Sequence, residues 1–375
     1  MQTAVRVSFD SAVAADRRGY DIRIGPGLLE DLPDLLREAC PAHRYAVIAD
    51  SRVNELYGDL VLSVLGGAGH PVDLFQFPAG EANKSRAQWA RLSDELLAAG
   101  LGRDAAVVAL GGGVTGDLAG FVAATFLRGI PLVQIPTSLL AMIDSSVGGK
   151  TGVDTEAGKN LIGAFHQPLL VVADTETLST LPAEEVRSGL AEAVKHGAIA
   201  DHAYFAGIAE RAESLLEVES SAMTELIRRS VEIKAAVVSA DEREGGLRKT
   251  LNFGHTIGHA VEALSGFRLL HGEAVSIGMV VEAALGEALG RTQSGTADRL
   301  RETLERLGLP VAIPPDQATD RIVALTRVDK KARGGRVEYA LIERIGAADA
   351  GTGSFGTPVD ESEVIAAVDH CRQAS

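Results

Sequence analysis

The sequence predicts an α/β protein in two parts: an N-terminal domain built on a parallel sheet, and a mostly α-helical C-terminal domain. In the first half, short apolar runs alternate with amphipathic stretches, which is the rhythm of β-α-β units. After Leu181-Pro182, helical patterns follow one another with little strand signal. At 375 residues, the chain also exceeds the roughly 250–300 residues at which a single core usually stops growing.

Four strands and one helix are expected in the first half. The strands are short aliphatic runs, typical of strands buried on both faces of a parallel sheet. They cover residues 45–50, 105–110, 132–136 and 169–173, and the helix covers residues 86–99.

Four helices and one strand are expected in the second half. The helices cover residues 184–200, 219–240, 254–264 and 273–290, and the strand covers residues 336–342. The change of pattern near residues 178–182 divides the chain into domains 1–178 and 179–375. No low-complexity linker separates them, so the two domains are expected to share a broad interface with a cleft.

Composition and charge exclude several classes of partner. The net charge is −15 and no basic stripe offsets it, which argues against nucleic acid or an anionic membrane surface. No continuously apolar stretch is long enough to span a membrane, and the N-terminus lacks the apolar core of a signal peptide. Two cysteines, Cys40 and Cys371, make no disulfide framework and predict a cytoplasmic protein.

A glycine-rich run at residues 111–117 follows a predicted strand and opens a helical run at residues 118–126. It matches G-x-G-x-x-G, in which glycines let the backbone approach a pyrophosphate at a helix N-terminus. The acidic residue usual at the end of the next strand is missing, because that strand runs into Pro136-Thr137-Ser138. The run therefore indicates a different subtype of nucleotide site, or else a tight structural turn.

The densest polar run lies at residues 144–159. Its Gly-Gly-Lys-Thr segment resembles the end of a P-loop, but Asp144 stands where the first glycine would be, which excludes that motif. Lys150, Lys159 and the neighbouring Asn160 still predict an anion-binding loop, since ammonium groups bind phosphate well. The alternative is a solvated, flexible loop.

Three of the nine histidines lie within seventeen residues: His255, His259 and His271. The first two are four residues apart, which places them on one helix face. Imidazole is the commonest transition-metal ligand, and a glutamate with two histidines is a catalytic zinc set that keeps one position open. Glu192, His255 and His271 can form such a set, leaving His259 for proton transfer or anion contact. A surface or core histidine pair is the alternative.

Two lysines on predicted helices are further candidates. Lys195 lies three residues after Glu192, a spacing that a surface ion pair would also explain. Lys234 borders the apolar side of its helix, so its side chain either extends to solvent or points into a polar site. Arg248 and Asn252 flank the approach to His255.

These residues, in this order, resemble the sugar phosphate cyclases, and among them the 3-dehydroquinate synthase family most closely. The match runs from Gly80-Glu81 to Asp329-Lys330-Lys331. Its most specific pieces are residues 111–117, 136–137, 144–150, 158–160, 191–195, 252–259 and 271–274.

The resemblance implies an NAD-binding N-terminal domain, a helical C-terminal domain, and a Zn²⁺ or Co²⁺ ion between them. It assigns the metal to Glu192, His255 and His271. It places NAD against Asp50, Glu81, Lys84, Gly113, Val114, Thr115, Gly116, Asp117, Thr137, Ser138, Lys150, Lys159, Thr177, Leu178, Ser179 and Thr180. Substrate contacts would be Asp144, Lys150, Asn160, Lys195, Lys234, Arg248, Asn252, His259 and Lys331. Arg128 resembles the arginine that reaches the phosphate of a neighbouring subunit, which implies a homodimer.

The activity implied is that of the shikimate route to aromatic amino acids. The family's sugar phosphate substrate, 3-deoxy-D-arabino-heptulosonate 7-phosphate, is an anion at both ends. Transient oxidation by NAD acidifies a C–H bond, phosphate leaves by β-elimination, the hydride returns, and an intramolecular aldol step closes the ring of 3-dehydroquinate. The phosphate would contact Lys150, Asn160, Asn252 and His259, and the carboxylate Lys234 and Arg248.

Other functions remain open. A sister cyclase making 2-deoxy-scyllo-inosose or a valiolone would act on a substrate without the carboxylate, whereas Lys234, Arg248 and Asn252 favour the carboxylate substrate. A metal-dependent polyol dehydrogenase would share the nucleotide domain, but the run from Lys150 to Asn160 argues against it. An inactive sensor on the same fold would be expected to lack a ligand or a lysine, and none of these positions is lost.

Overall fold

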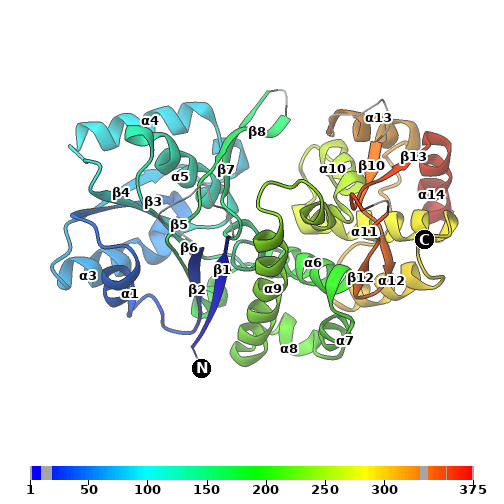
Figure 1. Ribbon diagram of the computed structural model, residues 1–375, viewed down its shortest axis with the longest axis horizontal. Coiled ribbons are helices and arrows are strands. Elements are labelled where there is room, and N and C mark those ends of the chain that lie inside the picture. The colour runs from blue at the N-terminus through cyan, green and yellow to red at the C-terminus, as the bar shows by residue number, and fades with distance from the viewer. Residues whose placement is uncertain (1, 10–18, 157, 330–336, 352, 374–375) are drawn as a thin grey trace. The chain divides into compact units, whose positions relative to one another are not determined.

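Two units make up the chain in the computed structural model, which describes residues 2–9, 19–156, 158–329, 337–351 and 353–373 (Figure 1). The first unit contains residues up to Leu181 together with Met223–Ala235, and the second contains Pro182–Ala222 and Ala236–Ser375. The sequence predicted a single break near residues 178–182. It did not predict that the middle of one long helix belongs to the first unit.

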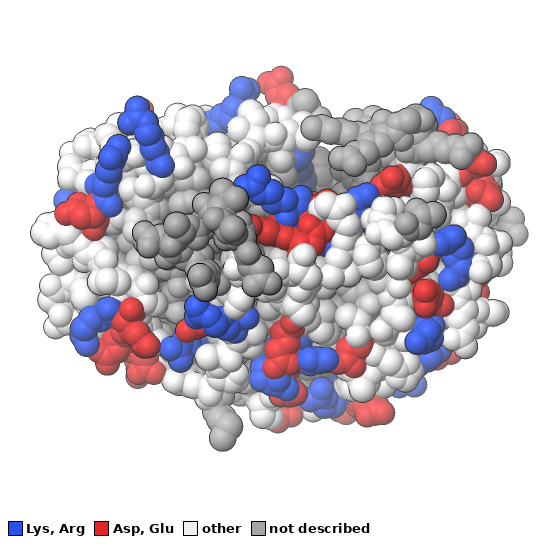
Figure 2. Space-filling model, viewed as in Figure 1, with Lys and Arg blue, Asp and Glu red and all other residues white. Residues whose placement is uncertain are grey.

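The surface mixes charges of both signs. On the face drawn in Figure 2, Lys and Arg side chains lie among Asp and Glu side chains, in a chain whose net charge is −15. Within the described residues, no helix combines the length and the apolar character needed to cross a bilayer.

The first unit is built on a seven-stranded sheet with the order β1-β2-β9-β6-β5-β3-β4. All neighbouring strands are parallel except β1 and β2, which pair antiparallel. The strands are β1 (Thr3–Ser8), β2 (Gly19–Gly25), β3 (Arg44–Asp50), β4 (Val72–Phe77), β5 (Ala105–Gly111), β6 (Leu132–Pro136) and β9 (Leu170–Asp174). The parallel sheet and its four predicted strands, β3, β5, β6 and β9, are confirmed. The sequence missed β1 and β4, edge strands in which exposed residues interrupt the apolar run, and also β2, in which buried and partly buried residues alternate.

Helices cover both faces of this sheet (Figure 1). Helices α4 (Arg86–Ala98) and α5 (Gly113–Thr125) lie on one face, and α1 (Leu32–Ala39) and α3 (Asp59–Gly67) on the other. Helix α4 begins where predicted because the Ser85 side chain accepts a hydrogen bond from the Gln88 amide at 3.3 Å. Side chains of the central strands β5, β6 and β9 are therefore buried on both faces of the sheet.

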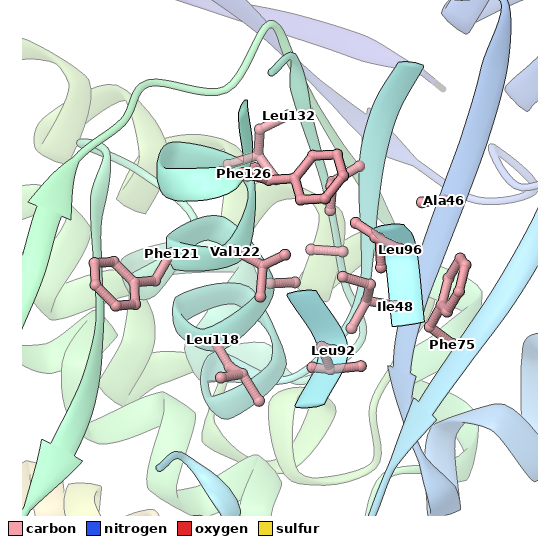
Figure 3. Close-up of a cluster of buried hydrophobic side chains, with 14 of the residues drawn as sticks. Ala46, Ile48, Phe75, Leu92, Leu96, Leu118, Phe121, Val122, Phe126 and Leu132 are labelled. Atoms are coloured by element: carbon pink, nitrogen blue, oxygen red, sulfur yellow. The ribbon is translucent and has the colours of Figure 1, made fainter. Parts of the chain in front are cut away.

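The alternation of side chains along β3 shows how the two cores are divided. Ala46 and Ile48 point into the core under α4 and α5, with Leu92 and Leu96 of α4 (Figure 3). Tyr45, Val47 and Ala49 point into the opposite core. Successive strand residues face opposite sides, and both sides are buried here. Both sets of side chains are therefore apolar, and β3 is a continuous hydrophobic run in the sequence.

Strands β3 and β5 are neighbours at the point where the strand order changes direction. From β3 the chain continues outward to β4, and from β5 it continues to β6 on the other side. Ligands of open parallel sheets bind in the crevice at the carboxyl ends of such strands. Here these ends are Asp50 and Gly111, and the hydroxyl of Thr115 donates to Asp50 Oδ2 across them at 3.2 Å.

The polar run at residues 144–159 is not the loop that the sequence predicted. It begins in a π-helical turn (Ala141–Ser145) and continues into a hairpin of β7 (Lys150–Thr155) and β8 (Gly158–Phe165). Residues 151–153 of β7 are buried and β7 contacts α5, so packing against this helix orders what would otherwise be a solvated segment.

Helices dominate the second unit. They are α6 (Ala183–Ala200), α7 (His202–Glu210), α8 (Ala212–Leu216), α10 (His255–Leu264), α11 (His271–Ala288), α12 (Thr296–Arg306), α13 (Thr319–Asp329) and α14 (Glu361–Gln373), while α9 (Ser220–Ala240) is shared with the first unit. The four predicted helices are confirmed as α6, α9, α10 and α11. The strand predicted at 336–342 is wrong in extent: its described part holds β10 (Val337–Tyr339) and the start of β11 (Ile342–Arg344). These pair separately with β13 (Thr357–Val359) and β12 (Ala347–Ala348).

Two adjacent leucines on α4 provide a test of the core. Leu96 is 0% exposed, whereas Leu97 is 55% exposed. Replacing Leu96 with Ala removes buried methyl groups and leaves a cavity, so we expect a loss of about 2–5 kcal/mol in the free energy of unfolding. Leu97→Ala should change it by less than about 0.5 kcal/mol. Urea titration of both variants measures the difference, and equal effects would contradict this packing.

Candidate functional site

The glycine-rich run forms the turn between β5 and α5. Helix α5 begins at Gly113, earlier than predicted, so Gly113, Val114, Thr115, Gly116 and Asp117 form its first turns. A side chain at Gly111 would place its Cβ 2.4 Å from Thr115 Oγ1, which explains why only glycine fits at the strand end. The helix N-cap, Gly112, contributes no capping side chain, and a helix N-terminus of this kind attracts an anion.

Most residues predicted to contact NAD lie at the same edge of the sheet. Thr137 and Ser138 follow β6, and the Thr137 amide donates to Gly111 O at 3.0 Å. The segment Thr175–Thr180 follows β9, and the Thr180 hydroxyl lies 2.6 Å from the Tyr57 hydroxyl. Within that segment Thr177 and Leu178 are buried, whereas Ser179 and Thr180 are exposed. The carboxyl ends of β3, β5, β6 and β9 thus bring these residues to one edge.

Lys84 lies buried among three carboxylates. Its Nζ is 2.9 Å from Glu81 Oε1 and 3.5 Å from both Asp117 Oδ2 and Asp154 Oδ1. Burial lowers the pKa of Lys84, but the three carboxylates outweigh it and hold the pKa above its usual value. Burial raises the pKa of Asp117 to about 6, although Lys84 opposes the shift. The buried ammonium of Lys84 therefore compensates the charge of these carboxylates.

The β7–β8 hairpin joins this cluster. Lys150 is exposed at the start of β7, and Lys159 Nζ lies 3.5 Å from Glu81 Oε1. Asn160 has a positive φ of 55°, and its amide donates to Asp154 Oδ1 at 2.8 Å. Asp154 was missed by the sequence analysis. Its place between Lys150 and Asn160 was a signal, but a carboxylate is not expected in an anion-binding loop.

Asp144 and Lys234, both in the first unit, form a pair. Lys234 is buried, its Nζ lies 2.7 Å from Asp144 Oδ1, and it also donates to the Asp144 carbonyl oxygen. The ammonium group therefore points into a polar site, and the alternative that it extends to solvent is wrong. The two residues are 90 positions apart, and α9 brings them together.

Arg128 lies exposed at the turn after α5, away from the sheet edge just described. Leu127 and Arg128 have φ values of 49° and 71°. Two consecutive side-chain-bearing residues in the left-handed region are strained, which is more common at functional sites than elsewhere. The Ile130 amide donates to Ala123 O at 2.9 Å and closes the turn.

In the second unit, Glu192 and Lys195 form a buried ion pair on α6. Glu192 is 0% exposed and Lys195 is 1% exposed, so the alternative of a surface ion pair is wrong. A carboxylate in such a position is costly unless cations or hydrogen-bond donors surround it. Further cations or polar groups beside Glu192 would therefore offset the cost of burying its carboxylate.

Two histidines lie against this carboxylate. His255, the first residue of α10, and His271, the first residue of α11, both direct Nε2 at Glu192 Oε1, at 3.5 and 3.3 Å. His255 Nδ1 faces the Phe253 carbonyl oxygen at 3.2 Å, and His271 Nδ1 faces Glu262 at 3.7 Å. Metal-ligating histidines usually show this division, with one nitrogen on the ion and the other on an acceptor.

Electrostatics also suit a metal. Burial, and then the charge of Lys195, lowers the pKa of His255 well below its usual value, so its imidazole is neutral. Burial lowers the pKa of His271 as well, but the carboxylates of Glu192 and Glu262 that face its two ring nitrogens outweigh this and raise the pKa to about 9. A dication at this point would displace the proton and balance the carboxylate. Two imidazoles and a carboxylate fit a zinc-type ion.

His259 lies one turn further along α10. Its ring centroid is 5.3 Å from that of His255 and 5.7 Å from that of His271. Donor atoms of the three histidines all lie within 4.8 Å of one another. A third imidazole is thus within reach of a ligand bound beside the metal set.

Arg248 and Asn252 lie on the 3-10 segment Leu247–Asn252, directly before α10. Arg248 is buried and its amide donates to Asp241 Oδ2 at 3.0 Å, while Asn252 Nδ2 donates to Glu244 Oε1 at 2.7 Å. The same chain segment therefore places both residues at the approach to His255. Lys331, the remaining predicted contact, lies outside the described residues.

Solved structures share this fold over nearly the whole chain. A 2-deoxy-scyllo-inosose synthase complexed with carbaglucose-6-phosphate, NAD⁺ and Co²⁺ is 27% identical, with a TM-score of 0.89 and 99% of each chain covered. The 2-epi-5-epi-valiolone synthase of Streptomyces hygroscopicus subsp. jinggangensis, with NAD⁺ and Zn²⁺ bound, is 32% identical, with a TM-score of 0.87, and covers 97% of this chain and 100% of its own. The fold is that of the sugar phosphate cyclase class.

Sequence comparison defines the family within that class. The model of the 3-dehydroquinate synthase N-terminal domain matches residues 74–188, and that of the C-terminal domain matches residues 189–332. The 3-dehydroquinate synthase of Symbiobacterium thermophilum is 48% identical over 329 residues, which are 87% of this chain and 92% of that protein. The chain belongs to the 3-dehydroquinate synthase family.

Removing the buried ammonium of Lys84 tests the charge cluster. Lys84→Met removes the buried cation that three carboxylates share, while Lys159 stays 3.5 Å from Glu81, so we expect a loss of about 3–5 kcal/mol in the free energy of unfolding at pH 8. The pKa of Asp117 lies above its usual 3.8, so neutral Asp117 stabilises the fold below that pH, and this contribution is lost as the pH rises through about 6. At pH 5, Asp117 is protonated in both proteins and the difference should shrink.

Urea titrations at pH 5 and pH 8 measure this effect. Lys249→Met is the control, because Lys249 pairs with Glu338 at 2.9 Å with both side chains partly exposed. It should cost less than about 1 kcal/mol at either pH. A pH-independent loss in Lys84→Met would contradict the electrostatic origin of the effect.

Proposed function

We propose that this chain is a 3-dehydroquinate synthase, a phosphate-eliminating lyase that converts 3-deoxy-D-arabino-heptulosonate 7-phosphate to 3-dehydroquinate and phosphate. The observation that carries this is the buried set of Glu192, His255 and His271, in a chain 48% identical to a relative of that name. NAD, when bound, accepts and returns a hydride, and a Zn²⁺ or Co²⁺ ion acts as a Lewis acid on vicinal hydroxyls.

Glu192, His255 and His271 would hold the ion. NAD would lie at the carboxyl edge of the sheet. Its proposed contacts are Asp50, Glu81, Lys84, residues 113–117, Thr137, Ser138, Lys150, Lys159 and residues 177–180. The residues that follow β3, β5, β6 and β9, among them Asp50, the first turn of α5 and Thr137, support this by their common edge. NAD and metal in the 27% and 32% identical cyclases support both assignments.

Substrate contacts fall into two groups. Lys150, Asn160, Asn252 and His259 would hold the phosphate, and Lys234 and Arg248 the carboxylate. Asp144, Lys195 and Lys331 would complete the set of substrate contacts. Lys234 now bonds to Asp144, so a substrate carboxylate would replace one acceptor with another at the same ammonium. This pair favours a carboxylate-bearing substrate over those of the sister cyclases.

Domain roles, assembly and location complete the proposal. Residues 1–178 would bind NAD, and residues 179–375 would bind the metal and most of the substrate. The protein would act as a cytoplasmic homodimer, with no nucleic-acid or membrane partner. The two buried cysteines, which form no disulfide, support the cytoplasmic location, and the mixed charge of the face in Figure 2 argues against a nucleic-acid partner.

The assay follows phosphate release and NADH absorbance together, with NAD and Zn²⁺ supplied to 3-deoxy-D-arabino-heptulosonate 7-phosphate. We expect phosphate and 3-dehydroquinate in equal amounts and no steady rise of NADH, because each hydride is returned. His255→Ala should abolish turnover, whereas His202→Ala, an exposed histidine outside the cluster, should not.

Other outcomes would assign a different function. A steady NADH rise without phosphate release would indicate a dehydrogenase. Turnover of glucose 6-phosphate or sedoheptulose 7-phosphate, with none of the carboxylate substrate, would indicate a sister cyclase. No turnover of any of these would contradict the assignment to the cyclase reaction.

The role of Arg128 can be tested by subunit complementation. If Arg128 contacts the phosphate bound to its partner, Arg128→Ala should lower kcat/KM roughly 10- to 100-fold, through the loss of a charge-assisted hydrogen bond. Co-expression with His255→Ala should then restore about a quarter of wild-type activity, since half the dimers are mixed and each has one complete site.

The control is co-expression of His255→Ala with Glu192→Gln, two variants that damage the same subunit's metal set and should not complement. Size measurement by light scattering accompanies both. A dimer without complementation would exclude Arg128 from the partner's site, and a monomer would contradict the proposed assembly.

A further inference from the structure

Two buried glutamates outside the metal set connect α10 and α11. Glu262, near the end of α10, reaches His271 at the start of α11, with Oε2 at 3.7 Å from Nδ1. Glu282, on α11, reaches back to the start of α10, where His255 lies. Each helix thus sends a carboxylate to the other helix at its histidine end.

Glu282 replaces a missing helix cap. The N-cap of α10 is Gly254, with φ of 80° and no side chain to accept the first amide groups. Glu282 accepts them instead: Oε2 from the Gly254 amide at 2.7 Å, and Oε1 from the Ile257 amide at 3.0 Å. These two residues bracket His255, so the carboxylate fixes the main chain that carries this ligand. A negative charge at a helix N-terminus is also favourable.

Close contact of the helices makes this geometry rigid. A Cβ at Gly278 would lie 1.9 Å from the Gly254 carbonyl oxygen, and one at Gly258 would lie 3.0 Å from the Ala274 carbonyl oxygen. Glycines therefore let the two backbones touch where the glutamates cross. Both carboxylates are buried, so a movement of either helix that separated them from their present contacts would leave a buried charge without compensation, which is unfavourable.

We propose that Glu262 and Glu282 are positioning residues for the metal: Glu262 orients the imidazole of His271, and Glu282 anchors the backbone of His255. This rests on the metal assignment of the proposed function. Carboxylates behind ligating histidines fix the ring orientation and raise ligand basicity, and their loss typically weakens metal binding about 10- to 100-fold.

The test is Co²⁺ binding by the full-length protein after its metal has been removed with a chelator. Visible absorption reports both the affinity for Co²⁺ and its coordination geometry. Glu262→Gln keeps the size of the side chain but removes the charge facing His271. Glu282→Gln turns one acceptor oxygen into an amide donor that opposes a backbone N–H. We expect each variant to bind Co²⁺ about 10- to 100-fold more weakly, with an altered absorption spectrum.

Glu287→Gln is the matched control. Glu287 lies on the same helix α11 and also caps another helix, accepting from the Ala297 amide of α12 at 2.8 Å. It faces none of the three histidines in the described contacts, so its Co²⁺ affinity and spectrum should equal those of the wild type. NAD affinity and circular dichroism of all variants show whether the fold is retained.

The outcomes separate the two levels of the proposal. If Glu262→Gln and Glu282→Gln lower only thermal stability, with Co²⁺ affinity and spectrum like those of Glu287→Gln, the positioning role is wrong and the metal site stands. If the wild type binds no Co²⁺, or Glu192→Gln binds it equally well, the metal assignment fails and the positioning role fails with it.

Discussion

The buried carboxylate of Glu192 is the constraint on which the helical unit depends. A charge at 0% exposure needs compensating groups around it: Lys195 on the same helix pairs with it, and the first residues of α10 and α11 place their imidazoles against it. The three helices must therefore meet at one point. Glycines permit that approach, because a Cβ at Gly272 would lie 2.0 Å from the Ser188 carbonyl oxygen of α6. Packing and chemistry thus impose the same geometry.

The first unit also contains a buried charge surrounded by groups of the opposite sign, but there the central group is a cation. There a buried ammonium, Lys84, is surrounded by Glu81, Asp117 and Asp154, and Asp154 also holds the main chain of Asn160. The hairpin that carries Lys150, Lys159 and Asn160 is consequently tied to the first turns of α5. Clusters of buried charge are rarely the most stabilising way to fill a protein interior, so their presence in both units is better explained by ligand binding.

Fold alone would not distinguish the possible activities. Structures of sister cyclases align over nearly the whole chain, although their names indicate different products. The proposed difference between these activities lies in particular side chains. The main one is whether cationic side chains are placed to bind a carboxylate of the substrate. Lys234 is buried against Asp144, and Arg248 is buried beside the loop that Asp241 organises. Under the proposed function, these cations would select a substrate that carries a carboxylate.

Sequence by itself determined the fold class, the four central strands, the helices α6, α9, α10 and α11 and the order of the motifs, because these depend on local periodicity and residue type. It did not predict β1, β2 and β4, in which buried residues are mixed with exposed or partly buried ones, or the β7–β8 hairpin, which contact with α5 orders. Only the tertiary structure decided that Glu192 and Lys195 are buried, that Lys234 meets Asp144, and that Asp154, Glu262 and Glu282 lie behind the predicted residues. Burial and contacts between distant residues arise from packing, which local sequence does not encode.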